Sequence, residues 1–315
     1  MDGLLQGCER HHAAGEPLSG ANPRIKVSSP MSKVAIVTDT TACLPKELVE
    51  EYGIKMVPMS LIFEDRVYRD EVDITASEVY QMLEQEEKIP STSAPSPGSY
   101  LEAFRELSQR AESIVCISMP TELTMAFQSA TQAKEMAKDE LPHTAVEVID
   151  CRSAAGALGL VTLAAARAAA AGQSLDEVIK IIKDMMQRVH MIGLVDTLVY
   201  LARGGRIPKV AAWAGDVLKV KPILTLSQGK PAPLTAVRTK ARGLERLLEI
   251  MQHRTGSNSP IHVIVLHANV LKEAESLKQR ISQEFNCVEI YVKDFTPVMG
   301  VHTGPGLIGI AFYAD

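Results

Sequence analysis

Five short segments of the chain collect hydroxyl groups, glycines and a few charged side chains between runs of apolar residues. Hydroxyl groups and backbone amides donate hydrogen bonds to an anion without adding a buried charge, and arginine or histidine adds a stronger donor. Such groups, brought together, suit the binding of a carboxylate or a phosphate. The five segments are 38–41, 91–97, 118–124, 201–208 and 301–306.

The segment 91–97 offers three hydroxyl side chains in a row, Ser91, Thr92 and Ser93, followed by prolines that stiffen the backbone. A helix cap is the competing interpretation, because Ser96 followed by proline is a good helix start. Both hold together if Ser96 caps the helix and the three earlier hydroxyls remain for a ligand. At 38–41, capping by Asp39 or a threonine is favoured over direct ligand contact.

Three further segments offer other donors. In 118–124, either Thr121 or Thr124 could cap the next helix while the other points into a crevice. In 201–208, two glycines followed by Arg206 suit either a tight turn or an anion site. In 301–306, His302 stands among glycines that leave room for a ligand, although a single histidine is more often structural.

Several common catalytic motifs are missing from the sequence. It has no GxxxxGK[ST] loop, no GxGxxG fingerprint, no HExxH motif and no GxSxG elbow, so a kinase, a dehydrogenase, a zinc protease and an ordinary α/β-hydrolase gain no support. One enzyme alternative stays open, a hydrolase or transferase with Ser93 or Thr121 as nucleophile and His302 as base. Another alternative is a sensor that binds a small carboxylate or phosphate at the two glycines before Arg206.

The elements that must position these segments follow from the patterning. Short β-branched runs alternate with helical patterns from residue 31 onward, which predicts an α/β fold with parallel sheets and ligand-binding segments at the carboxyl ends of strands. Expected strands are 33–38, 55–63 with a break at Pro58, 113–117, 145–149, 191–195, 223–226, 234–237, 261–266, 288–292 and 307–312. Expected helices are 45–52, 77–86, 97–108, 124–138, 154–171, 175–187, 239–251 and 271–285.

Length and composition bound the domain organisation. The 315 residues exceed a typical single domain, so we expect two α/β domains, 31–175 and 176–315. Residues 1–30 lack periodicity and the apolar core of a signal peptide, and we interpret them as a disordered leader or an overextended start. The alanine-rich run 154–171 contains Arg167 and is interpreted as a buried helix of a soluble protein rather than a membrane span.

Charge and cysteine content indicate which classes of partner and ligand the protein is unsuited to. The formal net charge is −5 and the basic residues are scattered, which disfavours a nucleic-acid surface. The five cysteines are isolated and lack metal-ligand spacing, which predicts reduced thiols in the cytoplasm and no metal site.

Eight short motifs follow one another along the chain in a specific order. They are TDTTA at 38–42, PSTSAPS at 90–96, FQSA at 127–130, IDCRS at 149–153, LARGGRI at 201–207, KPIL at 221–224, VRTK at 237–240 and HTGPG at 302–306. In order and spacing they resemble the DegV family, the fatty-acid-binding proteins of bacterial fatty-acid kinase systems. The resemblance runs from about residue 33 to the C-terminus.

This resemblance implies a DegV/EDD-like fold of two α/β domains, with a lipid tunnel and a polar mouth near the domain interface. It implies one long-chain fatty acid as the ligand and no cofactor. The family's carboxylate-binding groups fall, by position, on Ser91, Thr92, Ser93, Thr121 and His302.

The resemblance also implies a partner, a separate ATP-dependent fatty-acid kinase subunit that phosphorylates the bound carboxylate and so provides acyl-phosphate for phospholipid synthesis. Arg206 and Arg238 would lie near the mouth and serve partner docking or phosphate transfer. The chain itself would then be a carrier without catalytic residues, and transient contact with a membrane surface is compatible with that role.

One segment departs from the family pattern, which usually reads SSxLSGTYQSA there. This chain has Met125 and Ala126 at the glycine and its neighbour, although Thr121 keeps a hydroxyl. We expect the tunnel to differ at this point, so the family's chain-length preference does not carry over. An acyl chain gains about 0.8 kcal/mol per buried methylene. The 13 methionines could line such a tunnel, although core packing explains most of them equally well.

Overall fold

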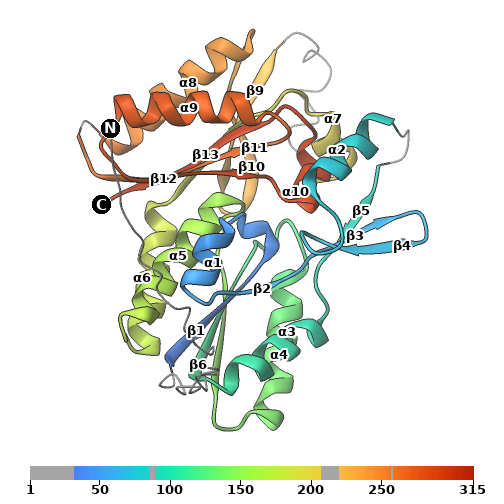
Figure 1. The fold of residues 1–315 in the computed structure, drawn as a ribbon, viewed down its shortest axis with the longest axis vertical. Helices are drawn as coiled ribbons and strands as arrows, with labels where there is room; N and C mark the ends of the chain where they lie inside the picture. The colour runs from blue at the N-terminus through green and yellow to red at the C-terminus, as the bar shows by residue number, and fades with distance from the viewer. Residues whose placement is uncertain (1–31, 86–88, 207–219, 257) are drawn as a thin grey trace, which may run out of the picture. The chain divides into compact units, whose positions relative to one another are not determined.

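The computed structural model describes residues 32–85, 89–206, 220–256 and 258–315. The interpretation of residues 1–30 as a leader, and the end of the segment 201–208, lie outside the described residues. Three β-sheets form in the part of the chain that is described, with four, six and three strands (Figure 1).

The four-stranded sheet is parallel and has the strand order β2–β1–β6–β7. Its strands are nearly continuous apolar runs because helices cover both faces. On one face Val37 and Ile114 pack with Tyr100 and Phe104 of α3. The strands are β1 (Ser32–Asp39), β2 (Lys55–Val57), β6 (Ala111–Ser118) and β7 (Ala145–Asp150), and the helices are α1 (Lys46–Glu51), α3 (Pro97–Ser108), α4 (Ala126–Glu140), α5 (Gly156–Ala170) and α6 (Leu175–Arg188).

The six-stranded sheet has the order β10–β9–β8–β13–β11–β12, in which β11–β12 is the parallel pair and the other pairs are antiparallel. One face packs against α8 and α9, where Leu247 and Leu277 meet Ile192 and Val263. The strands are β8 (His190–Leu194), β9 (Lys221–Ser227), β10 (Lys230–Val237), β11 (Ile261–His267), β12 (Cys287–Asp294) and β13 (Ile308–Ala314), and the helices are α8 (Lys240–Thr255) and α9 (Leu271–Glu284).

The prediction of parallel sheets is therefore wrong for this second sheet. Parallel neighbours need a long crossover connection, whereas β9 and β10 are joined by a turn of two residues. Those residues, Gln228 and Gly229, both have positive φ, 49° and 80°, as a type I′ hairpin turn requires. Gln-Gly is a weaker sequence signal for this turn than Asn-Gly, so the hairpin is hard to recognise from the sequence.

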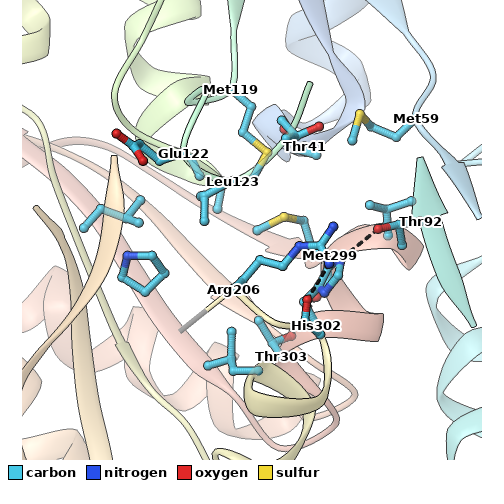
Figure 2. A pocket seen from close by; sticks show the side chains of 18 of the residues that line it. Thr41, Met59, Thr92, Met119, Glu122, Leu123, Arg206, Met299, His302 and Thr303 are labelled. Carbon is cyan, nitrogen blue, oxygen red and sulfur yellow. Dashed lines mark hydrogen bonds between the residues drawn. The ribbon is translucent and has the colours of Figure 1, made fainter. Parts of the chain in front are cut away.

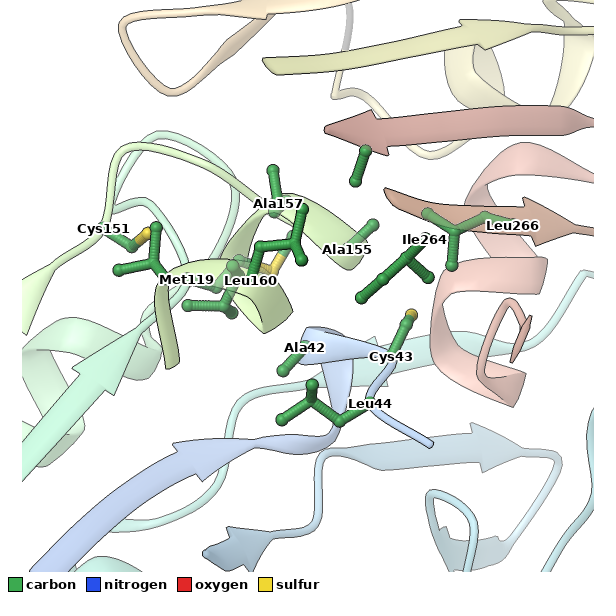
Figure 3. Packing of buried hydrophobic residues seen from close by; sticks show 14 of the residues in the cluster. Ala42, Cys43, Leu44, Met119, Cys151, Ala155, Ala157, Leu160, Ile264 and Leu266 are labelled. Atoms are coloured by element: carbon green, nitrogen blue, oxygen red, sulfur yellow. The ribbon is translucent and has the colours of Figure 1, made fainter. Parts of the chain in front are cut away.

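Helix α5 packs against strands of both larger sheets. Val34 and Ile36 of β1 belong to the same apolar core as α5. Figure 3 shows Ile264 and Leu266 of β11 in this core together with Leu160 of α5. Small residues make this close packing feasible: a methyl group at Gly156 would lie 2.9 Å from the Cβ atom of Ala311. The alanine-rich run is thus a buried helix, as the sequence predicts.

The predicted boundary between residues 175 and 176 falls after the first residue of α6. It follows the last strand of the first sheet and precedes the first strand of the second. Residues Met31–Asp315 nevertheless hold together as one unit, because α5 is common to both halves. The two-part α/β architecture is present, and the boundary itself stays a prediction. Within the described part of the chain, no helix is long and apolar enough to cross a membrane.

Short elements surround the place where the halves meet. They are a three-stranded antiparallel sheet of β3 (Ser60–Phe63), β4 (Arg66–Arg69) and β5 (Ser91–Ser93), the 3-10 turn η1 (Thr40–Ala42), and the helices α2 (Ala76–Gln85), α7 (Val199–Arg203) and α10 (Pro297–Thr303). Three of them, β5, α7 and α10, fall wholly or partly in segments that the sequence predicts as loops. Each is at most seven residues long, too short to show periodicity among hydroxyls and glycines.

Candidate functional site

A cavity of about 830 Å³ lies where β5, α10, α7, β8, β9 and the segment after β6 come together (Figure 2). This volume falls within the range of about 300–1,000 Å³ that is typical of small-molecule sites. Four of the five predicted ligand-binding segments reach its wall with several residues, and Thr41 represents the fifth. The structure therefore brings residues of all five segments to one cavity.

His302 and Thr92 form the polar end of the cavity. His302 lies in the last turn of α10, and its Nε2 atom is 2.8 Å from Oγ1 of Thr92 on β5. Thr92 pairs with the buried Leu61 in the β3–β5 register, so strand alternation turns its side chain inward. The two residues are 210 positions apart in the sequence, and only the fold brings them together.

The surroundings of His302 keep its ring neutral. Burial, together with the positive charge of Arg206, lowers the pKa of His302 to about 4. Its Nδ1 atom is buried and has no hydrogen-bond partner among the described residues. A buried N–H without an acceptor is rarer than a buried lone pair without a donor, so we assign the proton to Nε2. Nε2 then donates to Thr92, and the Thr92 hydroxyl proton can be donated to a ligand.

Arg206 adds a positive charge at the same end. Its side chain lines the cavity, and Nη1 donates to the carbonyl oxygen of Gly204 (Figure 2). A guanidinium has five N–H donors in a planar fork, which suits a carboxylate or phosphate. Arg206, His302 and Thr92 together can hold an anion that would otherwise be costly to bury.

The other predicted site residues are placed differently. Thr121 and Ser93 line the cavity, but the Thr121 hydroxyl donates to Asp150 over 2.8 Å and the Ser93 hydroxyl to the carbonyl oxygen of Ala94 over 3.2 Å. Ser91 and Arg238 are exposed and are not among the residues that line the cavity. The structure thus brings Thr92, His302 and Arg206 together, with Ser93 and Thr121 on the same wall.

The predicted helix caps are partly correct. Ser96 caps α3 by accepting a hydrogen bond from the backbone of Ser99, and Asp39 accepts one from the backbone of Thr41. Neither Thr121 nor Thr124 caps α4, whose N-cap is Met125. That prediction is wrong because α4 begins two residues later than the pattern indicates, and Thr121 is instead bound to Asp150.

Sequence reasoning missed four hydroxyl residues of the wall, Thr41, Ser129, Thr225 and Thr303. Thr41 belongs to the first polar segment, but its hydroxyl donates to the buried Asp39. Ser129 lies in the first turn of α4, within the FQSA motif, and that motif was its available signal.

The remainder of the wall is largely apolar and rich in methionine. Five of the 13 methionines line it, which gives the apolar part flexible side chains that adapt to varied shapes. Leu201, Leu224 and Phe295 add to it. The methionines are Met59, Met119, Met125, Met191 and Met299.

The β9–β10 hairpin borders the cavity near the segment after β6. A methyl group at Gly229 would lie 2.9 Å from Cβ of Pro120, and Lys230 pairs with Glu122 at 3.0 Å. Met125, on the same side, is 63% exposed although it lines the cavity. The expected difference from the family pattern at Met125 therefore concerns the cavity wall. Among the described residues, no group of three or more His, Cys, Asp and Glu side chains could hold a metal ion.

Comparison with known proteins identifies the family. The sequence model of the DegV family matches residues 33–315. The chain belongs to the DegV family. Protein DegV of Bacillus subtilis is 31% identical over 280 residues, which cover 89% of this chain and 98% of that protein. A DegV domain-containing protein of Halalkalibacterium halodurans is 32% identical over 288 residues, which cover 90% of this chain and all of that protein.

Solved structures of DegV family proteins share the fold. A fatty-acid-binding DegV family protein from Thermus thermophilus matches with a TM-score of 0.84 at 28% identity, covering 90% of this chain and 100% of the other. DegV of Bacillus subtilis, a fatty acid binding protein, matches with a TM-score of 0.82 at 29% identity, with the same coverage. A stearic acid-binding protein from Eubacterium ventriosum matches with a TM-score of 0.79 at 26% identity, covering 89% and 98%. The predicted family and fold class are confirmed.

Proposed function

We propose that this protein binds one long-chain fatty acid in the cavity, with the carboxylate at Thr92, His302 and Arg206 and the acyl chain along the methionine-rich wall. The observation that carries the proposal is the joining of three polar groups to a largely apolar cavity of about 830 Å³. They are the Thr92 hydroxyl, the neutral His302 ring that donates to it, and the Arg206 guanidinium. The fatty-acid-binding relatives described above support the same ligand class.

The energetics fit this ligand class. Each buried methylene contributes about 0.8 kcal/mol, so the acyl chain supplies most of the affinity. The carboxylate then needs donors, because an unpaired charge is expensive to bury. A small carboxylate at Gly204 and Arg206, the sensor alternative, would occupy the same cavity and leave its apolar wall empty.

The direct test is mass spectrometry of ligand extracted from the purified protein, followed by calorimetric titration of the delipidated protein with hexadecanoic acid. Gly193 offers a blocking variant, because Met191, Gly193 and Val195 line the cavity from the same face of β8 and the segment after it. A Cβ atom at Gly193 would have room, since its nearest neighbours would be the carbonyl oxygen of Ile308 at 3.9 Å and Cδ1 of Leu307 at 4.0 Å. Gly193→Phe should exclude the acyl chain, and Gly98→Ala, at an exposed position in the first turn of α3, should not. Recovery of only polar metabolites would contradict the proposal.

We further infer that the carboxylate is presented to a separate ATP-dependent kinase subunit, which forms the acyl-phosphate. Arg206 at the polar end and the exposed Arg238 are the candidates for phosphate transfer and docking. Phosphoryl transfer depends on positioning, so His302→Ala should retain lipid, because the chain supplies most of the affinity, yet fail as a substrate carrier. Arg238→Ala should retain lipid and lose efficiency with the kinase.

A reconstituted assay with the cognate kinase, read as acyl-phosphate formation beside lipid content, tests this inference. Normal acyl-phosphate formation by His302→Ala, or complete loss of its lipid, would contradict the role given to His302. Normal transfer by Arg238→Ala would remove Arg238 from the docking surface.

The enzyme alternative has one observation in its favour, since the 2.8 Å between Thr92 and His302 would suit a nucleophile and its base. It would need the other tautomer, in which Nε2 carries no proton and accepts that of the Thr92 hydroxyl. Ser93 and Thr121, the predicted nucleophiles, instead donate to Ala94 and Asp150. No described residue bonds to Nδ1 of His302 to orient the ring. Steady acyl-ester hydrolysis by the pure protein, abolished in Thr92→Val, would favour this alternative over the carrier.

A further inference from the structure

Asp70 is a fully buried carboxylate outside the cavity wall. It follows β4, its side chain has no exposed surface, and it is not among the residues that line the cavity. A buried carboxylate persists where several donors satisfy it. Asp70 has donors from two separate elements, and both elements carry residues of the cavity wall.

The first donor belongs to α10. The backbone N–H of Val298, in the first turn, donates to Oδ1 of Asp70 over 2.9 Å, from 228 positions away in the sequence. The N-cap residue of α10, Thr296, makes no side-chain capping bond of its own. Asp70 therefore caps this helix from another part of the chain. Since α10 has only seven residues and His302 lies in its last turn, a change of tilt at the capped end moves the imidazole.

The second donor to Asp70 belongs to the 3-10 turn η1. The hydroxyl of Thr40 in η1 donates to Oδ2 of Asp70, and the Thr40 oxygen in turn accepts the backbone N–H of Met59 over 3.2 Å. The backbone N–H of Asp70 also donates to the carbonyl oxygen of Met59 over 2.9 Å. Met59 lines the cavity, so one carboxylate ties the η1–β3 side to the helix that carries His302.

We propose that Asp70 is a positioning residue for the carboxylate-binding end of the cavity, which holds α10 so that His302 stays in hydrogen-bond contact with Thr92. The proposal rests on the proposed binding of a fatty acid. An asparagine of the same shape keeps its carbonyl oxygen as the acceptor for Val298, but the NH2 group in place of Oδ2 donates and cannot accept the hydrogen bond from the Thr40 hydroxyl. Aspartate is the residue of this size that accepts from both sides.

Two ligands with the same sixteen-carbon tail can separate an effect on the carboxylate-binding end from a general loss of stability. Hexadecanoic acid uses both the polar end and the apolar wall, whereas hexadecanol lacks the anionic group. In the delipidated full-length protein, Asp70→Ala should weaken binding of the acid by about tenfold, the effect of one lost hydrogen bond to a charged group. Binding of the alcohol should change much less. The affinity of Asp70→Asn for the acid should lie between those of Asp70→Ala and the unaltered protein. Asp73→Asn, which removes an exposed carboxylate from the same segment, is the matched control.

A second measurement does not depend on ligand binding. In NMR titrations of the delipidated protein, the depressed pKa of His302 should move toward its ordinary value in Asp70→Asn and stay unchanged in Asp73→Asn. Equal weakening of acid and alcohol, or an unchanged His302 titration in the Asp70 variants, would overturn the proposal. If the unaltered protein binds neither probe, the proposed function fails, and the titration alone decides the role of Asp70.

Discussion

The Nδ1 atom of His302 faces the α-carbon of Gly204, where a methyl group would lie 2.6 Å from that nitrogen. Gly204 has φ −70°, so its backbone suits any residue, and space rather than conformation requires glycine here. The contact joins the end of α7 to the end of α10. It also explains why a paired glycine and a distant histidine belong to one site.

We therefore predict that Gly204→Ala displaces the His302 ring and costs about 1–3 kcal/mol, as overpacking of a tight contact does. Urea unfolding measures the stability, and calorimetric titration with hexadecanoic acid measures the loss of affinity. Gly98→Ala, where the nearest atom outside the neighbouring residues is 3.6 Å away, should leave both unchanged. Unaltered affinity in Gly204→Ala would mean that His302 does not bind the carboxylate.

Thr92 and Thr121 should differ in their importance. Thr92→Val removes the hydroxyl that bonds His302 and should weaken hexadecanoic acid binding by about 0.5–1.5 kcal/mol. Thr121→Val should have a smaller effect, because its proton already goes to Asp150. Ser91→Ala is the control at the exposed neighbouring position. A larger loss in Thr121→Val than in Thr92→Val, measured by calorimetry, would reverse this assignment.

Binding of a fatty acid should raise the pKa of His302. In the empty site burial and Arg206 lower it to about 4, and a carboxylate beside the ring favours the charged imidazolium and offsets the arginine. NMR titration with and without hexadecanoic acid measures the shift, with His302→Gln identifying the resonance. Hexadecanol should leave the pKa of His302 where it was. No shift with the acid would place the carboxylate elsewhere.

Asp70 should make the protein more stable in mild acid. Burial raises its pKa from 3.8 to about 6, so between these values the folded state binds more protons than the unfolded state. The group's unfavourable contribution at neutral pH is therefore relieved as the pH falls through about 6. The charged Glu71 and the thiol of Cys43 also face it, and Lys293 lies beside both.

The difference in unfolding free energy between Asp70→Asn and the unaltered protein isolates this effect. As the pH rises from 4 to 7, the unaltered protein should lose up to about 3 kcal/mol of unfolding free energy relative to Asp70→Asn. This figure corresponds to a pKa shift of about two units. Urea unfolding at several pH values measures it. A difference that stays constant with pH would show that Asp70 does not titrate in this range.

Much of the fold could be predicted because long elements carry strong periodicity. The helix at Pro97–Ser108 has the predicted bounds, and Leu175–Arg188 differs by one residue. The antiparallel arrangement of the second sheet could not be predicted, because strand direction depends on pairing between residues far apart, such as Ile264 with Ala311. The short α10 was missed for a related reason: its cap, Asp70, lies in another element.

The residues of the candidate site could be predicted, but the hydrogen bonds that they make could not. Residue type indicates which side chains can bind an anion, and the family resemblance placed Thr92, Arg206 and His302 at one site. The structure brings these three side chains to one cavity, and their role in binding stays a prediction. Whether a hydroxyl is already used depends on its neighbours in space. Thr121 has Asp150 as its partner, and no local pattern in the sequence reveals that bond.

Glycines of α5 bring this helix close to its neighbours on two sides, to Ala311 of β13 at Gly156 and to Ala42 of η1 at Gly159. A methyl group at Gly159 would lie 2.5 Å from the carbonyl oxygen of Ala42, so even backbone is in contact there. We therefore expect the two larger sheets to move as one rigid body rather than to open and close around the cavity. An acyl chain would then pass through a gap opened at the rim, where the Lys230–Glu122 pair and the exposed Met125 are the parts most easily displaced.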